Sequence, residues 1–235
     1  EYKYYVSEES LKFLRSNLSL FMSLDENLDS KTNSYTVTSL YFDTPFHNDF
    51  DEKVDGVRSR EKYRLRIYNH SDNIIKFECK KRVETVIRKL SSSISKESSE
   101  KMINGDYSNL IANDDAFLNK AYGKLTSSGY KPAVIVEYDR EAFTLPYGNI
   151  RITFDKNLRT YNSCKDLFEL RKNPYTPVYL DGVQILEVKF SLPLPEPISK
   201  IISKVAAPRC AISKFVMGQK YIESSRWQDK IDAPF

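Results

Sequence analysis

The stretch from Arg58 to Lys81 decides the fold. It reads Arg58-Ser59-Arg60-Glu61-Lys62-Tyr63-Arg64-Leu65-Arg66-Ile67-Tyr68, then a polar link, then Lys76-Phe77-Glu78-Cys79-Lys80-Lys81. In both halves charged residues alternate with apolar ones, which is the period of a β-strand, so the charged side chains of each half share one face. The link Asn69-His70-Ser71-Asp72-Asn73 is rich in turn formers. The pattern predicts an antiparallel hairpin with one almost wholly charged face.

The same alternation recurs in three later stretches, Tyr138-Asp139-Arg140, Ile150–Asp155 and Ile185–Phe190. A single charged strand face is usually a solvated face. Here the pattern extends over five strands, each with an apolar row opposite the charged one. We therefore interpret the charged rows as parts of one functional surface.

Length and composition bound the class of protein. The chain has 235 residues, of which 40% are hydrophobic and 13% aromatic, and these values fit one globular domain over residues 1–235. Its formal net charge of +4 is too small to indicate a nucleic-acid binder by itself. Three cysteines without CxxC or Cys/His spacing predict a reducing compartment, the cytoplasm, and neither zinc nor disulfides. No apolar run has the roughly 20 residues of a membrane span, so any membrane tether would belong to parts outside this chain.

Eight segments have strand character, and helical segments are interspersed among them rather than alternating with them. The first helix is expected after Ser7, which has the character of an N-cap. This order predicts an α+β fold, an eight-stranded antiparallel β-barrel with helices packed on the outside. The eight segments are 1–6, 35–42, 58–68, 76–81, 85–92, 133–143, 149–156 and 183–190.

If helices cover the outside, the charged rows point inward. Unpaired buried charges cost several kcal/mol each, so acids and a bound polyanion must neutralise such an interior. We therefore expect a ligand with several phosphates, because arginine binds phosphate with two hydrogen bonds and lysine supplies a compact charge. The expected phosphate-binding cations are Lys3, Arg64, Arg66, Lys80, Arg88, Arg140, Arg151 and Lys189.

Three glutamates, Glu1, Glu78 and Glu187, share these faces. A hard divalent cation that bridges phosphate oxygens binds one or two carboxylates plus water, which is typical of Mg²⁺ or Mn²⁺. Glu187 is the first candidate for the metal, and Glu1 and Glu78 are the weaker ones. The alternative is that each glutamate forms an intrastrand ion pair with the lysine two residues away.

Several motifs together resemble the vacuolar transporter chaperone (VTC) domain of polyphosphate polymerases, which belongs to the triphosphate tunnel metalloenzymes. They occur in the order of that family and cover nearly the whole chain. The motifs are Glu1-Tyr2-Lys3-Tyr4, Ser39-Leu40-Tyr41-Phe42-Asp43, Arg60–Tyr68, Glu78-Cys79-Lys80, Tyr138–Phe143, Leu186-Glu187-Val188-Lys189 and Ser213-Lys214-Phe215.

The resemblance implies roles for individual residues. Glu187 falls at the metal-binding glutamate, Tyr138 at the tunnel tyrosine, and Arg88 where a lysine is usual. Ala211 stands where the eukaryotic polymerases have a lysine, with Arg209 the nearest substitute. The residues that fall at phosphate-binding positions are Lys3, Arg64, Arg66, Lys80, Arg140, Arg151, Ser213 and Lys214.

The function that follows is metal-dependent transfer of the terminal phosphoryl of ATP to a polyphosphate chain, with Mn²⁺ or Mg²⁺ as cofactor. Basic side chains would hold the triphosphate and offset developing charge, while the metal polarises the transferred phosphoryl group. The residues expected to take part in the chemistry are Arg64, Arg66, Lys80, Arg140, Arg151 and Glu187.

Two other functions stay open. A tunnel triphosphatase would use water as acceptor, and a non-catalytic module would bind polyphosphate or inositol polyphosphates without turning them over. Nucleic acid is not an expected partner, because aromatic residues such as Tyr63 and Phe77 alternate away from the basic row.

Overall fold

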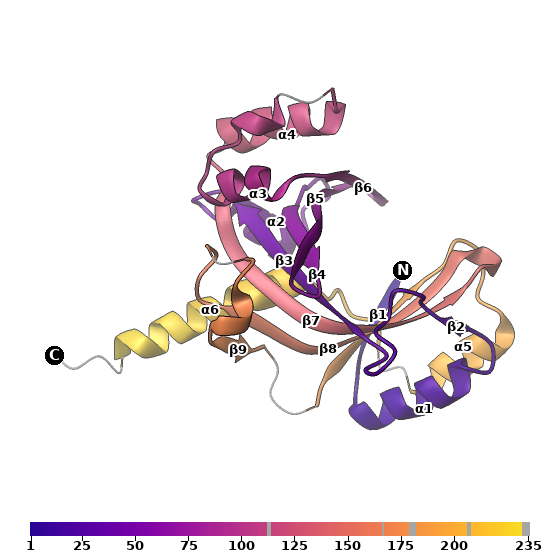
Figure 1. Ribbon diagram of the computed structural model, residues 1–235. Coiled ribbons are helices and arrows are strands. Elements are labelled where there is room, and N and C mark those ends of the chain that lie inside the picture. The colour runs from indigo at the N-terminus through magenta and orange to yellow at the C-terminus, as the bar shows by residue number, and fades with distance from the viewer. Residues whose placement is uncertain (112–113, 166, 179–181, 206–207, 232–235) are drawn as a thin grey trace. The chain divides into compact units, whose positions relative to one another are not determined.

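The computed structural model (Figure 1) describes residues 1–111, 114–165, 167–178, 182–205 and 208–231, with side chains as far as residue 224. The chain folds into two compact units. The first comprises Glu1–Thr36, Glu137–Arg159 and Pro177–Ser213, and the second comprises Val37–Val136, Thr160–Thr176 and Lys214–Phe235. Two long strands, β7 (Lys131–Leu145) and β8 (Ile150–Tyr161), contribute residues to both. The single domain expected from the sequence stays a prediction.

In the first unit, antiparallel strands pair in the order β1-β10-β8-β7, where β1 is Tyr2–Val6 and β10 is Gln184–Lys189. The two-residue strand β2 (Ser23–Leu24) pairs with β7. A further short strand, β9 (Tyr175–Pro177), whose first two residues belong to the second unit, pairs with β8.

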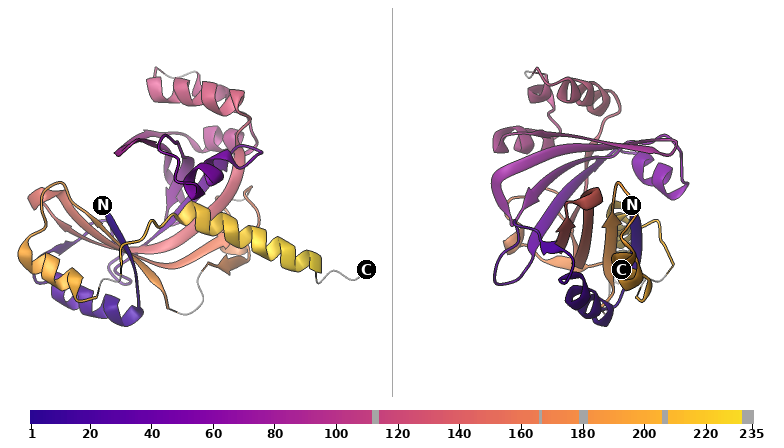
Figure 2. Two further views of the ribbon diagram at one scale, coloured as in Figure 1. Left: turned by 180° about the vertical axis from the view of Figure 1, so that it is seen from behind. Right: turned by 90° about the vertical axis from the view of Figure 1, so that its right-hand side faces the viewer.

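One face of this sheet is apolar. Tyr4 lies opposite Leu186, which lies opposite Phe154, and all three are buried. Helices α1 (Glu8–Leu18) and α5 (Glu196–Ser203) lie side by side against this face, and their leucines and isoleucines complete the core (Figures 1 and 2). As expected, Ser7 caps α1: its hydroxyl accepts a hydrogen bond from the Ser10 backbone N–H at 3.2 Å.

The second unit contains the hairpin predicted from the opening stretch. Its strands pair in the order β3-β4-β5-β6. Asn69 and His70 alone form the turn between β4 and β5, both with positive φ (52° and 56°), the backbone that suits a two-residue hairpin. The predicted link of five residues is thus too long, because Ser71 already pairs with Tyr68. The strands are β3 (Tyr35–Asp43), β4 (Tyr63–Tyr68), β5 (Ser71–Val83) and β6 (Val86–Ser93).

The apolar side of strands β3 to β6 also carries helices. Leu65 and Phe77 are directly opposite each other and fully buried. Helices α3 (Lys96–Ile103) and α4 (Ala116–Ser127) pack their apolar residues into the same core. The remaining elements of the described chain are α2 (Asn48–Val54), α6 (Lys214–Ile231) and the 3-10 turns η1 (Ser108–Leu110), η2 (Tyr147–Asn149) and η3 (Leu170–Lys172).

The predicted α+β class with an antiparallel sheet is confirmed, and helices cover the apolar faces as expected. The main path of the sheet has the eight expected strands; β2 and β9 bring the total described to ten. Strands of two and three residues are too short to show alternation, so the sequence did not reveal them. Among the described residues no pairing joins β1 to β6, the two ends of the path, so the strands do not form the expected closed ring.

No helix in the described ranges is long and apolar enough to cross a membrane. The three cysteines, Cys79, Cys164 and Cys210, all lie within described residues and form no disulfide.

Candidate functional site

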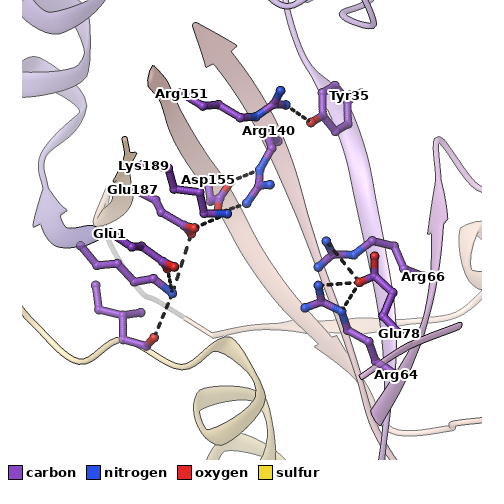
Figure 3. Close-up of polar contacts among 12 residues, drawn as sticks. Glu1, Tyr35, Arg64, Arg66, Glu78, Arg140, Arg151, Asp155, Glu187 and Lys189 are labelled. Carbon is purple, nitrogen blue, oxygen red and sulfur yellow. Dashed lines mark hydrogen bonds and ion pairs between the residues drawn. The ribbon is translucent and has the colours of Figure 1, made fainter. Parts of the chain in front are cut away.

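The face of the first unit's sheet opposite its core is charged (Figure 3). Lys3 lies directly opposite Glu187, which lies opposite Thr153 on β8. Lys189 lies opposite Arg151. Cross-strand partners point to the same side of a sheet, so these side chains share one surface. This surface, the first charged face, comprises Lys3, Arg140, Arg151, Thr153, Asp155, Glu187 and Lys189.

Lys3 joins two glutamates at this face. Its Nζ lies 3.1 Å from Glu1 Oε1 and 3.8 Å from Glu187 Oε2. Burial would lower the pKa of Lys3, but the charges of Glu187 and Glu1 outweigh burial and raise it, so the ammonium stays protonated. Lys189 Nζ lies 2.8 Å from Glu187 Oε1. The intrastrand ion pair considered as the alternative to a metal is therefore present at Glu187.

Two arginines of the first charged face are held by carboxylates. Arg140 donates through Nε and Nη2 to the two oxygens of Asp155, at 2.6 and 2.8 Å, and its guanidinium lies 5.2 Å from the ring of buried Tyr138. Burial would lower the pKa of Arg140, but Asp155 raises it well above its ordinary value. Arg151 lies 2.6 Å from Asp25 and donates to the Tyr35 hydroxyl at 3.1 Å. These contacts fix both arginines before any ligand binds.

The second unit has its own charged face on β3, β4 and β5. Arg64 Nε donates to Glu78 Oε2 at 2.7 Å, and its Nη1 donates to the Tyr41 hydroxyl at 3.1 Å. Arg66 Nε donates to Ser39 Oγ at 3.1 Å, and its Nη1 lies 3.9 Å from Glu78 Oε2 (Figure 3). The two arginines predicted to share a face therefore do so. Both converge on one buried carboxylate.

Glu78 has a third cationic partner that the sequence did not indicate. Lys89 on β6 forms an ion pair with Glu78 Oε1. Although burial alone would raise the pKa of Glu78, the charges of Arg64, Arg66 and Lys89 lower it to about 2. Glu78 is therefore ionised at neutral pH and is fully engaged by protein cations.

The register of β5 and β6 corrects the position expected for Arg88. Lys80 lies opposite Lys89, on the same side as Glu78, whereas Arg88 lies opposite Lys81 on the other side. The phase of β6 is set by the turn at residues 84–85, where Val83 pairs with Val86, and the sequence alone does not specify that turn. The expectation that Arg88 shares the charged row is wrong. Its phosphate-binding role stays a prediction, and Lys89 takes the place on the charged face.

The last two predicted phosphate-binding residues lie at the start of α6. Ser213 comes immediately before the helix and Lys214 is its first residue. Burial would raise the pKa of Tyr41, yet the charges of Arg64, Arg66 and Lys214 lower it. Lys214 therefore adds to the positive potential around Tyr41 in the second unit.

The oxygen atoms around Glu187 fit a hard divalent cation. Glu1 and Glu187 share Lys3 as a partner, and the hydroxyl of Thr153, opposite Glu187, is buried without a hydrogen-bond partner. Two carboxylates and a hydroxyl suit Mg²⁺ or Mn²⁺ when water and phosphate oxygens supply the other ligands. Within the described residues no three His, Cys, Asp or Glu side chains form a metal-binding group of their own. Glu78 fits less well, because three cations already occupy its carboxylate.

Several residues that hold the arginines were not predicted from the sequence. Ser39 and Tyr41 lie two residues apart on β3 and pair with Arg66 and Arg64. Their alternation on a predicted strand was a usable signal. Asp25 lies in the chain after β2, and nothing in its sequence context points to Arg151.

A protein-family model described as "VTC domain" matches residues 1–222. The chain belongs to the VTC domain family. This confirms the resemblance found in the sequence motifs, and the match includes residues of both units of the fold. No curated protein matches the chain in sequence.

Solved structures with similar folds are distant in sequence. A candidate adenylate cyclase from Bacillus halodurans is 15% identical, with 86% of this chain and 84% of that chain covered and a TM-score of 0.49. The PH1819 protein from Pyrococcus horikoshii is 13% identical, with coverages of 95% and 98% and a TM-score of 0.45. A candidate adenylate cyclase from Vibrio parahaemolyticus is 13% identical, with coverages of 94% and 96% and a TM-score of 0.46. Likenesses this distant assign no activity to the VTC domain described here.

Proposed function

We propose that this VTC domain is a metal-dependent polyphosphate polymerase that transfers the terminal phosphoryl of ATP to a polyphosphate chain. The observation that carries the proposal is the charge imbalance on β4, β5 and β6. Over the described residues 60–66, 76–82 and 87–93, which include the segment that leads into β4, Glu78 is the only acid on the charged side. The cations on that side are Arg60, Lys62, Arg64, Arg66, Lys76, Lys80, Arg82 and Lys89. A surface of this kind favours a polyanion.

The arginines are suited to hold phosphate groups in fixed positions. Asp155 orients Arg140, and Glu78 with Tyr41 orients Arg64, so little side-chain entropy is lost when phosphate binds. Each charge-assisted hydrogen bond to a phosphate oxygen contributes about 1.5–3 kcal/mol. The proposed phosphate-binding set includes Lys3, Arg64, Arg66, Lys80, Tyr138, Arg140, Arg151, Lys189, Ser213 and Lys214.

Glu187 is the proposed metal ligand, with Glu1 and the Thr153 hydroxyl as further oxygen donors. A bound Mn²⁺ or Mg²⁺ would polarise the transferred phosphoryl group and neutralise the charge that develops on it. In this structure the Glu187 carboxylate is neutralised by Lys3 Nζ, 3.8 Å from Oε2, and by Lys189 Nζ, 2.8 Å from Oε1. No general base is assigned, because the chemistry rests on positioning and electrostatic stabilisation.

The partners in this proposal are ATP and polyphosphate. Inositol polyphosphates carry the same chemical groups and would bind the same cations. The proposed location of the protein is the cytoplasm, the reducing compartment that the cysteine content predicts.

The decisive experiment incubates the protein with ATP and Mn²⁺ or Mg²⁺ and separates the products on a gel that resolves phosphate chain length. We expect a ladder of long chains that disappears when the metal is chelated. Free phosphate alone would support the triphosphatase instead. Absence of turnover with either metal, while ATP still binds, would leave only the binding module.

A further inference from the structure

The segment from Pro208 to Ser213 lies along the outer edge of β1. Strand β1 ends the path of paired strands, so this edge presents backbone groups that β10 does not use. One of them, the carbonyl of Lys3, accepts a hydrogen bond from the Cys210 N–H at 3.0 Å. We name residues 208–213 the strap. It belongs to the same compact unit as β1 and ends immediately before α6.

The strap contacts both sides of β1. Alternation along the strand places the side chain of Lys3 on the first charged face and those of Tyr2 and Tyr4 on the opposite, apolar side. On the charged side, Lys3 Nζ donates to the Ile212 carbonyl at 3.4 Å. On the apolar side, the Arg209 guanidinium lies 3.5 Å from the centre of the Tyr2 ring. The strap therefore wraps around the edge of the sheet.

Arg209 fastens the strap to two tyrosines. The electron-rich face of an aromatic ring attracts a guanidinium, and Tyr2 offers such a face. Hydrogen bonding to the Tyr4 side chain is the largest cause that raises the pKa of Arg209, and Tyr2 adds to it. Tyr2 is itself packed edge-on against Phe190, with 4.9 Å between the ring centres. The guanidinium of Arg209 thus has a defined seat, although the residue is exposed.

This seat does not suit a phosphate-binding cation. By position in the sequence, Arg209 was the nearest substitute for the lysine that the eukaryotic polymerases have in place of Ala211. Its guanidinium lies on the apolar side of β1, however, whereas Lys3 and Glu187 lie on the charged side. The contacts of Arg209 therefore indicate a different role.

Two of the proposed phosphate-binding residues depend on the strap. Lys3 Nζ lies near Glu1 and Glu187, and the Ile212 carbonyl is a further group that orients it. Ser213 follows Ile212 directly in the chain, so the position of one limits that of the other. Displacement of the strap would move Ser213 and remove one of the groups that orient the Lys3 ammonium.

We infer that Arg209 is a positioning residue that acts through the strap. It fastens the strap on the apolar side of β1, and the strap in turn holds Lys3 and Ser213 where they can bind phosphate. The inference rests on the proposed function and adds to it a residue that acts without touching the substrate. Side chains held in place before binding favour affinity, because less ordering is needed when the ligand arrives.

The test compares wild type with Arg209→Ala in two measurements. The first is amide hydrogen exchange at Cys210, read by NMR, because this N–H bonds to the Lys3 carbonyl. We expect exchange to become about tenfold faster as the strap opens more often. The second is calorimetric titration with tripolyphosphate in the absence of metal. We expect the affinity to fall by about threefold to tenfold, because Lys3 and Ser213 must then be ordered on binding.

Three further variants separate positioning from loss of charge. Tyr2→Leu removes the ring under Arg209 but keeps every charge, so it should reproduce both effects. The double variant Arg209→Ala/Tyr2→Leu should be little worse than either single variant, because the two residues act as one unit. Arg209→Lys keeps a cation over the ring and should recover part of both losses.

Lys200→Ala is the matched control. It removes an exposed positive charge from α5 in the same compact unit and should match wild type in both measurements. Circular dichroism checks the fold of each variant.

Faster exchange at Cys210 with unchanged tripolyphosphate affinity would overturn the inference, because the strap would then be structural only. Weaker binding by Arg209→Ala, with normal exchange and a normal Tyr2→Leu variant, would also overturn it, because Arg209 would then contact phosphate directly. An Arg209→Ala protein that matches wild type in both measurements would do the same. Wild type that binds no tripolyphosphate would overturn the proposed function, and the positioning role with it, whatever the exchange rate at Cys210.

Discussion

Thr153 and Glu187 lie directly opposite each other on β8 and β10, and the Thr153 hydroxyl is buried without a hydrogen-bond partner. An unpaired buried hydroxyl costs about 1–3 kcal/mol. A hard cation at Glu187, or its bound water, would give this oxygen a partner. The pair is thus the part of the first charged face where a metal would improve the protein's own contacts.

Glu187→Gln tests the metal assignment. We expect loss of metal-dependent turnover, because the carboxylate acts mainly in the transition state. Triphosphate binding should stay within about tenfold, or roughly 1.4 kcal/mol, since the cations are retained. Turnover assays and calorimetry on the same sample separate the two effects. Glu196→Gln, which changes an exposed residue of α5, is the control, and a Glu187→Gln protein with normal turnover would shift the metal to Glu1 or Glu78.

Arg66→Ala should weaken triphosphate binding by about 1.5–3 kcal/mol, the value of a charge-assisted hydrogen bond. Arg66→Lys should recover part of this loss, because charge is retained while the two-pronged donor is not. Calorimetric titration with tripolyphosphate measures both. Arg171→Ala, an exposed arginine of η3, serves as the reference. Normal ATP binding by Arg66→Ala would mean that β4 does not contact the substrate.

Ligands with several phosphates should stabilise the protein. At a hundredfold excess over the dissociation constant, ATP or tripolyphosphate should add about 2.7 kcal/mol to the free energy of unfolding, seen as a higher melting temperature. Adenosine should have no effect, because it lacks phosphates. If tripolyphosphate leaves the melting temperature unchanged, both with and without metal, the charged faces do not bind phosphate groups and the proposal is contradicted.

Asp49 should make stability depend on pH. Burial raises its pKa, the hydrogen bond from Tyr130 at 2.7 Å lowers it, and Asp43 and Glu52 raise it again, to about 7 overall. Its other oxygen, Oδ2, is buried without a partner. Because the folded pKa lies above the ordinary 3.8, the contribution of Asp49 to stability is complete below about pH 4 and is lost as pH rises through about 7.

Asp49→Asn should therefore be more stable than wild type at about pH 8, by a few kcal/mol at most at about 1.4 kcal/mol per pKa unit. The advantage should shrink steadily as pH falls toward about 4. Urea unfolding across this range measures it. Asp51→Asn changes an exposed residue of the same helix and should show no such trend. A constant difference at every pH would contradict the prediction.

Gly218→Ala should destabilise the docking of α6. An added Cβ would lie 2.6 Å from Val136 Cγ2 and 3.2 Å from Val134 Cγ2, both in fully buried residues. Overpacking of this kind costs about 1–3 kcal/mol, which exceeds the gain of about 1 kcal/mol from replacing glycine within a helix. Thermal unfolding should show a lower melting temperature. A rise would mean that α6 moves away from β7 without cost.

The sequence by itself determined the antiparallel class, the eight main strands and the side on which most charged residues lie. These features follow from alternation along each strand, which is local: the backbone sends successive side chains to opposite faces wherever the strand pairs. The paired arginines at 64 and 66 and the glutamate–lysine pair at 187 and 189 were predictable for this reason.

Only the tertiary structure decided which charges meet. The two-residue turns at 69–70 and 84–85 set the registers that join Glu78 to Arg64 and to Lys89, and that place Arg88 on the other face. Asp25 meets Arg151 through a contact between distant parts of the chain, and Asp155 meets Arg140 across the β7–β8 hairpin, whose register no local pattern encodes. A shift of one residue in register reverses every side chain of a strand, so partner identity depends on the turn and on the packing of the whole sheet.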